Sequence, residues 1–168
     1  MSFTTISPGE YCDNVFDVIG KQWLLICVND GENTNAMTAS WGGLGVLWFK
    51  NVGTCYIRPQ RYTFELMERA VDYTLCVLPE GYKEAYEMLG RKSGRNSDKM
   101  DQCGLTLVRE GDVSYFKESR LVIVQKKLYA GDFKPEKFVD QAIHEVYPNK
   151  DYHRMYIGEV TEIKVRQS

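Results

Sequence analysis

The sequence contains only two histidines, His144 and His153, and its five cysteines lie far apart. The Cys-x-x-Cys and His-x-x-x-His spacings of common zinc sites do not occur, so we expect no bound metal. Cys27, Cys55 and Cys76 lie within apolar runs typical of strands, where a thiol behaves as a small apolar side chain. We therefore expect these cysteines to be reduced and buried.

Long apolar runs and an excess of one charge are also missing. The apolar run over residues 23–28 is far too short to cross a bilayer, and no basic region followed by an apolar segment begins the chain. The formal net charge of −2 gives no general attraction for nucleic acid. We expect a cytoplasmic protein with one domain over residues 1–168, no membrane segment and no nucleic-acid partner, so that any positive site must be local.

Three common functional motifs are incomplete. Residues 43–45 are Gly-Leu-Gly, which matches only two glycines of a dinucleotide fingerprint, and the alternation of strands and helices of a Rossmann unit is missing. The pair Lys92-Ser93 lacks the glycines of a P-loop. Ser40 stands in Ala-Ser-Trp-Gly instead of the Gly-x-Ser-x-Gly elbow of hydrolases, and nothing identifies a third member of a triad.

Apolar runs separated by turn residues predict a mainly β protein with short helices inserted between strands. We expect strands over residues 23–28, 33–41, 52–57, 73–78, 105–109, 113–116, 121–129 and 152–165, and helices over residues 7–20, 64–70 (with Thr63 as cap), 82–89, 97–102 (with Ser97 and Asp98 as cap) and 135–147. Residues 42–45 are expected to form a loop, and residues 110–112 a hairpin turn. His144, on the expected helix 135–147, is expected at the surface. This pattern favours a closed or partly open antiparallel barrel.

Hydroxyls, small residues and arginines gather in two stretches. Residues 35–43 read Asn-Ala-Met-Thr-Ala-Ser-Trp-Gly-Gly, which lets a flat ligand approach the backbone closely. Residues 56–63 place two arginines three apart beside a tyrosine and a threonine, and residues 92–95 add a basic loop. A phosphomonoester carries roughly −1.5 to −2 charge and needs about this much positive charge. The pattern predicts a nucleotide-like cofactor, although an Arg-Pro-Gln-Arg turn and a basic loop are also typical of a solvated surface.

Four motifs resemble the flavin reductase-like family, whose members are FMN-binding split barrels related to flavoredoxin. They are Asn-Ala-Met-Thr-Ala-Ser-Trp-Gly-Gly (35–43), Ile-Arg-Pro-Gln-Arg-Tyr-Thr (57–63), Lys-Ser-Gly-Arg-Asn-Ser-Asp-Lys (92–99) and Tyr-His-Arg-Met-Tyr-Ile-Gly-Glu-Val (152–160). The resemblance implies a mainly β, Greek-key antiparallel split β-barrel of six strands. It also implies a homodimer with one FMN per subunit near the dimer interface.

The resemblance also assigns residues to parts of the cofactor. Along the isoalloxazine ring it places Met37, Thr38, Ala39, Ser40 and Trp41; along the ribityl-phosphate end Arg58, Arg61, Tyr62 and Thr63; and at the phosphate Lys92, Ser93, Gly94, Arg95 and Lys99. Asn35 is a further expected cofactor-binding residue. His153 matches a histidine near the flavin or nicotinamide and is the candidate catalytic residue. One departure is Asn96, which stands where an acidic residue is expected.

The implied function is an FMN-dependent oxidoreductase. NAD(P)H would reduce the bound FMN, and the electrons would pass to free flavin, ferric iron or a redox protein. Two alternatives remain open at the level of sequence. One is a flavoredoxin-like electron-transfer protein with little NAD(P)H activity of its own, and the other is a split barrel that has lost its flavin.

Overall fold

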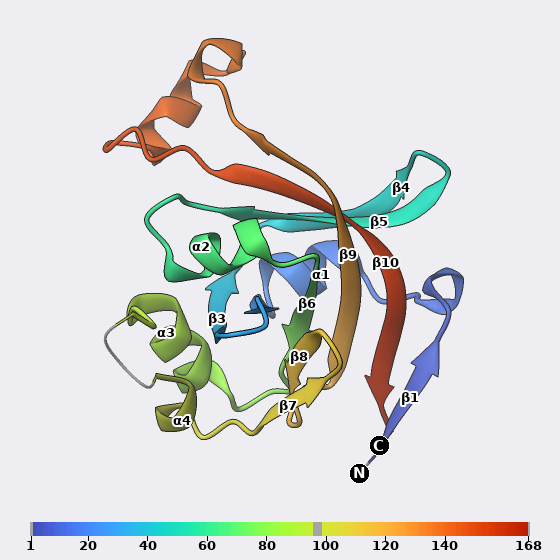
Figure 1. The fold of residues 1–168 in the computed structure, drawn as a ribbon. Coiled ribbons are helices and arrows are strands. Elements are labelled where there is room, and N and C mark those ends of the chain that lie inside the picture. Colours follow the sequence, from blue (N-terminus) through green and yellow to red (C-terminus); the bar gives the residue numbers. More distant parts are fainter. Residues whose placement is uncertain (1, 96–98, 168) are drawn as a thin grey trace.

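The protein is built around one long antiparallel sheet, seen in a computed structural model that describes residues 2–95 and 99–167 (Figure 1). Its elements are β1 (Phe3–Ile6), η1 (Pro8–Glu10), α1 (Val15–Gly20), β2 (Leu24–Asn29), β3 (Thr34–Ala39), β4 (Gly42–Leu47), β5 (Lys50–Ile57), α2 (Tyr62–Arg69), β6 (Asp72–Val77), α3 (Lys83–Arg91), α4 (Lys99–Gln102), β7 (Leu107–Glu110), β8 (Val113–Phe116), β9 (Leu121–Asp132), η2 (Pro135–Lys137), η3 (Gln141–Val146) and β10 (Arg154–Arg166). Within the described residues, no helix is long and apolar enough to cross a membrane.

The sheet is open, with β3 at one end and β4 at the other, in the order β3-β2-β6-β9-β10-β5-β4. Strand β10 pairs with β9 along most of its length, while its other edge is shared between β5 and β1. Only two residues, Ser40 and Trp41, connect the end strands β3 and β4. The predicted mainly β, antiparallel, partly open barrel is therefore confirmed.

The sheet separates two apolar cores, and strand β2 contributes to both. Leu24, Ile26 and Val28 belong to a core that includes residues of α1 and α2. Leu25 and Cys27 point the other way, into a core that includes residues of α3 and β8. This alternation is the period of two that a strand imposes, so a continuous apolar run marks a strand covered on both faces.

The cysteines in strands follow the expectation from the sequence. Cys27, Cys55 and Cys76 are fully buried and form no disulfide. Burial raises the pKa of each of these thiols, because it disfavours the charged thiolate. They are therefore packing residues. Cys12, in contrast, is exposed.

The expected loop over residues 42–45 was wrong, because this segment is the first part of strand β4. It pairs with β5 from Gly42 opposite Cys55 to Leu47 opposite Lys50. Its glycines permit a close approach of the two strands, since a Cβ on Gly42 would lie 2.7 Å from the carbonyl oxygen of Thr54. Here glycine marks close backbone contact within a sheet.

The β4–β5 hairpin ends in an exposed aromatic turn formed by Trp48 and Phe49. Both residues have positive φ, 53° and 59°, as a two-residue type I′ turn requires. Phe49 is fully exposed and Val46 nearby is 74% exposed. Figure 1 shows this hairpin extending away from the body of the molecule.

The single helix expected over residues 7–20 was also wrong. The chain forms the short turn η1, and helix α1 then starts afresh because the Asn14 side chain accepts a hydrogen bond from the Phe16 N–H at 3.1 Å. This start points Val18 and Ile19 into the core and leaves Phe16 89% exposed. The expected N-cap Thr63 lies instead within the first turn of α2, which begins one residue earlier.

The expected helix over residues 135–147 is replaced by the two short turns η2 and η3, because Asp140 caps a new start by accepting a hydrogen bond from the Ala142 N–H at 3.0 Å. These turns lie in the arm, which we define as residues 133–153 between β9 and β10, and which projects from the sheet (Figure 1). His144, expected at the surface, is half-buried, with its ring 5.4 Å from that of Phe138.

The remaining expected elements are present, with strand ends shifted by at most three residues; β1 is an additional strand. The hairpin turn at residues 110–112 is confirmed between β7 and β8. Ser97 and Asp98, the expected cap of the helix that the structure has as α4, lie outside the described residues, as does Asn96.

Candidate functional site

Two neighbouring cavities collect most of the residues that the sequence motifs single out, and Arg61 lines both. The β3 cavity, about 200 Å³, is lined by Met37, Thr38, Ala39, Ser40, Trp41, Tyr56, Arg58, Arg61 and His153. The α2 cavity, about 120 Å³, is lined by Asn35, Gln60, Arg61, Tyr62, Thr63, Arg91, Lys92, Ser93, Gly94 and Lys99. Because one arginine borders both, a single elongated ligand can occupy the two together.

The β3 cavity lies along an end strand of the sheet. Among the strands of the described residues, β3 pairs with β2 alone, so its outer edge keeps backbone N–H and C=O groups that none of these strands satisfies. Its side chains alternate: Met37 is buried in the core, and the Thr38 hydroxyl donates to the Tyr86 carbonyl oxygen of α3 at 2.5 Å. The hydroxyl of Thr38 is thus directed at α3. The strand offers a ligand mainly its backbone edge.

His153 and Trp41, which lie far apart in the sequence, both border this cavity. Their rings lie 5.1 Å apart, and the Nδ1 atom of His153 lies 2.8 Å from the hydroxyl of Tyr147. Burial and the nearby Arg58 lower the pKa of His153 to about 4, although Asp151 acts against them. The imidazole is therefore neutral at pH 7, and His153 can offer or accept a hydrogen bond there without carrying a proton for general acid catalysis.

Arg58 is fixed by the arm. Its guanidinium pairs with the Asp151 carboxylate at 2.6 Å, donates to the Val146 carbonyl oxygen at 3.1 Å, and lies 5.0 Å from the centre of the Tyr147 ring. The hydrogen bond from Arg58 holds the pKa of Asp151 below its ordinary value. The resemblance assigns Arg58 to the ribityl-phosphate end, but the structure puts it beside Trp41 and His153, with its charge matched by a carboxylate.

Three segments converge on the α2 cavity. The Asn35 side-chain amide of β3 donates to the Thr63 hydroxyl of α2 at 2.8 Å, and both residues are buried. Gly94 is the point at which the basic loop 92–95 comes closest to these residues. A Cβ on Gly94 would lie 2.2 Å from Asn35 Oδ1 and 3.0 Å from the Tyr62 ring. Only glycine lets the loop approach this closely. The contacts explain why the motifs 35–43, 57–63 and 92–95 belong to one site.

Positive charge in the α2 cavity lacks a matching carboxylate among the described residues. The Arg61 Nη2 atom is buried without a hydrogen-bond partner. Lys99 is 1% exposed and, within the part of the chain that the structure describes, donates to the carbonyl oxygens of Leu89 and Lys92, each at 3.1 Å. Burial, and then repulsion from Arg61, lowers the pKa of Lys99 to about 8, and burial likewise lowers that of Arg61. No side chain caps the first turn of α2, so its N–H groups add to this field.

Of the residues that the sequence assigned to a site, all except Arg95 line one of the two cavities. Arg95 instead pairs with Glu65 and donates to the Gln60 carbonyl oxygen at 3.0 Å. The arginine of this loop that lines the α2 cavity is Arg91, which sequence reasoning did not assign to the site although it adjoins Lys92. Gln60 and Tyr56 were also missed, yet both lie inside the stretch 56–63 that was singled out.

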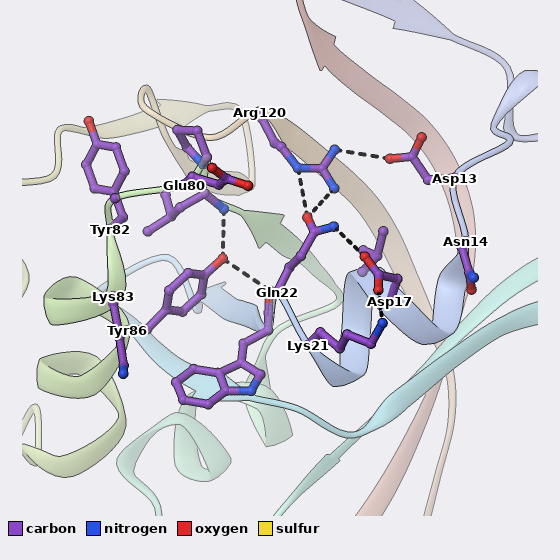
Figure 2. Close-up of a pocket in the computed structure, with 15 residues that line it drawn as sticks. Asp13, Asn14, Asp17, Lys21, Gln22, Glu80, Tyr82, Lys83, Tyr86 and Arg120 are labelled. Carbon is purple, nitrogen blue, oxygen red and sulfur yellow. Dashed lines mark hydrogen bonds and ion pairs between the residues drawn. The ribbon is translucent and has the colours of Figure 1, made fainter.

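A larger cavity, about 950 Å³, lies elsewhere, between α1 and the start of α3 (Figure 2). Several of its polar side chains are paired with one another. The Arg120 guanidinium pairs with Asp13 at 3.1 Å and donates to Gln22 at 2.6 Å, Gln22 donates to Asp17 at 3.1 Å, and the Tyr86 hydroxyl donates to the Trp23 carbonyl oxygen. Size alone would favour this cavity, but its Arg120 and Lys21 charges are each matched by a carboxylate. The unmatched charge of the α2 cavity makes the smaller pair the better candidate.

No protein-family model and no curated protein matches the chain, but solved structures do. A flavin reductase-like FMN-binding domain from Shewanella baltica superposes with a TM-score of 0.71 at 14% identity, over 98% of this chain and 77% of that one. Flavoredoxin of Desulfovibrio vulgaris gives 0.69 at 20%, over 96% and 78%. The NADH:FAD oxidoreductase of Streptomyces globisporus gives 0.67 at 12%, over 86% and 75%.

These sequence identities are too low to transfer an activity, but the TM-scores of 0.67–0.71 establish the fold. The structural neighbours of the chain are FMN-binding flavin reductase-like proteins and flavoredoxin, as the four sequence motifs indicated. The chain therefore has the split-barrel fold of the flavin reductase-like and flavoredoxin structures.

Proposed function

We propose that the protein binds FMN across the two cavities, with the phosphate in the α2 cavity and the isoalloxazine ring in the β3 cavity. The observation that carries this proposal is Arg61, a partly buried arginine with an unpartnered Nη2 atom at the junction of the two cavities. A buried cationic donor without a partner is costly unless a ligand supplies one. An elongated ligand with one anionic end meets that requirement.

The α2 cavity fits a phosphomonoester in charge and in shape. Arg61 and Lys99 supply buried positive charge, Arg91 and Lys92 lie at the rim, and the uncapped start of α2 supplies backbone N–H groups. A phosphomonoester with roughly −1.5 to −2 charge would neutralise this cluster. Gly94 keeps the space open, because any side chain there would collide with Asn35.

The β3 cavity fits a flat ring with polar edges. The outer edge of β3 offers backbone donors and acceptors, and Trp41, Tyr56 and His153 supply ring surfaces. When bound there, FMN supplies hydride and electron chemistry, and the protein supplies position and electrostatics. Arg61, which also lines this cavity and has an unpartnered Nη2 atom, adds positive charge, which favours the reduced, anionic form of a flavin.

The corresponding activity is that of an oxidoreductase that takes electrons from NAD(P)H and passes them to free flavin, ferric iron or a redox protein. Support comes from the fold shared with the NADH:FAD oxidoreductase of Streptomyces globisporus, a structure also solved with NAD and FAD fragments. The second candidate is a flavoredoxin-like electron carrier with little NAD(P)H activity. It is favoured by the similarity to flavoredoxin over 96% of the chain.

An absorbance spectrum of the purified protein, taken with added FMN under anaerobic conditions, tests both candidates. Binding of FMN followed by bleaching within seconds of adding NADH or NADPH supports the reductase and identifies its donor. Bleaching with dithionite alone supports the electron carrier. A protein that takes up no FMN contradicts the proposed cofactor and with it both functions.

We also propose that two copies of the chain associate. The exposed apolar side chains of Val46, Trp48 and Phe49 at the hairpin tip, with Tyr129 close to Trp48, are of the kind that a partner subunit covers. Sedimentation velocity should give a dimer for the wild-type protein and a shift toward monomer for Phe49→Ser. A wild-type monomer at micromolar concentration contradicts the proposal.

A further inference from the structure

A buried tyrosine contacts the one histidine that lines the β3 cavity. The hydroxyl oxygen of Tyr147 lies 2.8 Å from Nδ1 of His153, and the two residues are 5% and 8% exposed. Tyr147 is on the arm and does not line the cavity, so it reaches a ligand only through His153. Because Nδ1 is occupied, Nε2 is the ring nitrogen left for a ligand.

The hydrogen in this contact belongs to the tyrosine. Burial keeps both groups neutral, since it raises the pKa of Tyr147 and lowers that of His153 to about 4. If Nδ1 carried a hydrogen as well, the hydroxyl hydrogen of Tyr147 would lack a partner among the described residues. Donation from the hydroxyl to Nδ1 satisfies every one of these groups.

Tyr147 is held firmly enough to fix this geometry. Its ring stacks on Phe138 with an interplanar angle of 5°, contacts the Tyr152 ring at 4.9 Å, and lies under the Arg58 guanidinium. The backbone N–H of Tyr147 donates to the His144 carbonyl oxygen at 3.0 Å. The arm therefore presents the hydroxyl in one orientation.

We infer that Tyr147 is a positioning residue that holds His153 in the tautomer with hydrogen on Nε2, so that His153 presents a hydrogen-bond donor to a carbonyl oxygen of the ligand in the β3 cavity. The identity of this carbonyl rests on the proposed function: it belongs either to the isoalloxazine ring or to a nicotinamide carboxamide. A donor fixed before binding loses little entropy when the ligand arrives. The opposite tautomer would present a lone pair to the same oxygen and repel it.

The tautomer is measured directly by nitrogen-15 NMR of histidine-labelled, FMN-free protein at neutral pH. The chain has only two histidines, so His144→Gln assigns the remaining signals to His153. We expect an unprotonated Nδ1 and a protonated Nε2 in the wild type. Tyr147→Phe, which removes one oxygen atom, should give a mixture of tautomers, and Tyr152→Phe is the matched control from the same aromatic cluster. A wild-type protein with hydrogen on Nδ1 overturns the inference without any variant.

The source of the carbonyl is identified with FMN and NAD(P)H as separate probes. Loss of one oriented neutral hydrogen bond should change binding by about 2- to 12-fold. A change of this size in the FMN dissociation constant of Tyr147→Phe identifies the isoalloxazine ring. An unchanged constant with a similarly raised KM for NAD(P)H identifies the nicotinamide. In a His153→Gln background, whose amide supplies a donor without a tautomer, Tyr147→Phe should have no effect.

Two results separate this inference from the proposed function. Wild-type protein that fails to bind FMN overturns the proposed function, whatever the tautomer of His153. Wild-type protein that binds FMN, combined with a Tyr147→Phe variant that keeps the wild-type tautomer or changes neither constant, overturns the positioning role alone.

Discussion

Replacing Arg61 with methionine should have opposite effects on the free protein and on the FMN complex. In the FMN-free protein the substitution removes the Arg61 Nη2 atom, which is buried without a hydrogen-bond partner. It also removes a charge that is disfavoured there, because burial and Arg58 lower the pKa of the guanidinium. Removing an unsatisfied donor recovers roughly 1 kcal/mol, equivalent to a rise of about 2–4 °C in Tm for a chain of this size. An arginine needed for packing would give a fall instead.

The same substitution should weaken FMN binding strongly. A charged hydrogen bond contributes about 1.5–3 kcal/mol, so the dissociation constant should rise about 10- to 150-fold. At a free FMN concentration of 100 times the wild-type constant, ligand stabilises the wild type by about 2.7 kcal/mol, or roughly 5–11 °C. For a variant that binds 100-fold more weakly, the same concentration contributes only about 0.4 kcal/mol.

Thermal unfolding with and without FMN, together with a fluorescence titration, measures both effects on one pair of proteins. Arg109→Met is the control, because it removes an exposed guanidinium whose described hydrogen bond goes to Thr34 at 3.4 Å, outside both cavities. It should leave the FMN-induced rise in Tm unchanged. An Arg61→Met variant that loses stability without ligand and keeps the full rise with FMN would refute the reasoning.

Three further changes test other parts of the site. Gly94→Ala places a Cβ 2.2 Å from an amide oxygen and should lower the free energy of unfolding by about 1–3 kcal/mol in urea, while Gly9→Ala, which meets open space, should not. Burial and a neighbouring arginine lower the pKa of Lys99 to about 8, so FMN affinity should fall as the pH rises through 8 and Lys99 loses its charge. This pH dependence should be absent in Lys99→Met. If it persists in that variant, Lys99 does not bind the phosphate. The pKa of His153 is lowered from 6.5 to about 4 in the folded state, so the stability it contributes is complete above pH 6.5 and is lost as the pH falls toward 4. Urea unfolding of His153→Gln should therefore show a shallower loss over that range, and an equal slope would contradict the assigned pKa.

Sequence reasoning located the strands because their causes are local. A run such as residues 23–28 is apolar at every position, which is what a strand buried on both faces requires. It failed where a contact distant in sequence decides the local structure. Gly42 and Gly43 suggested a loop, yet their place in a strand depends on Thr54 of the partner strand. It also missed one local contact, the side-chain cap at Asp140, which divides an apparent helix into two turns.

The candidate site divides in the same way. The residue types near a phosphate could be read from the motifs, because arginine, lysine and glycine leave a compositional signal. Their partners could not: Asp151 is 93 residues from Arg58, and nothing in the local sequence of the arm marks Tyr147 as the neighbour of His153. Nor could sequence show that Arg95 is bound to Glu65 while Arg91 lines the cavity.

The aromatic turn of the β4–β5 hairpin has a consequence for the stability and solubility of the chain. Trp48 and Phe49 both adopt left-handed backbone conformations, which cost a bulky residue of order 1 kcal/mol or more each. Asn-Gly would form the same type I′ turn with far less strain and would also remove two exposed aromatic rings from solvent contact. The chain is thus less stable and less soluble than its own backbone permits, a local cost that the proposed association of two copies through this tip would offset.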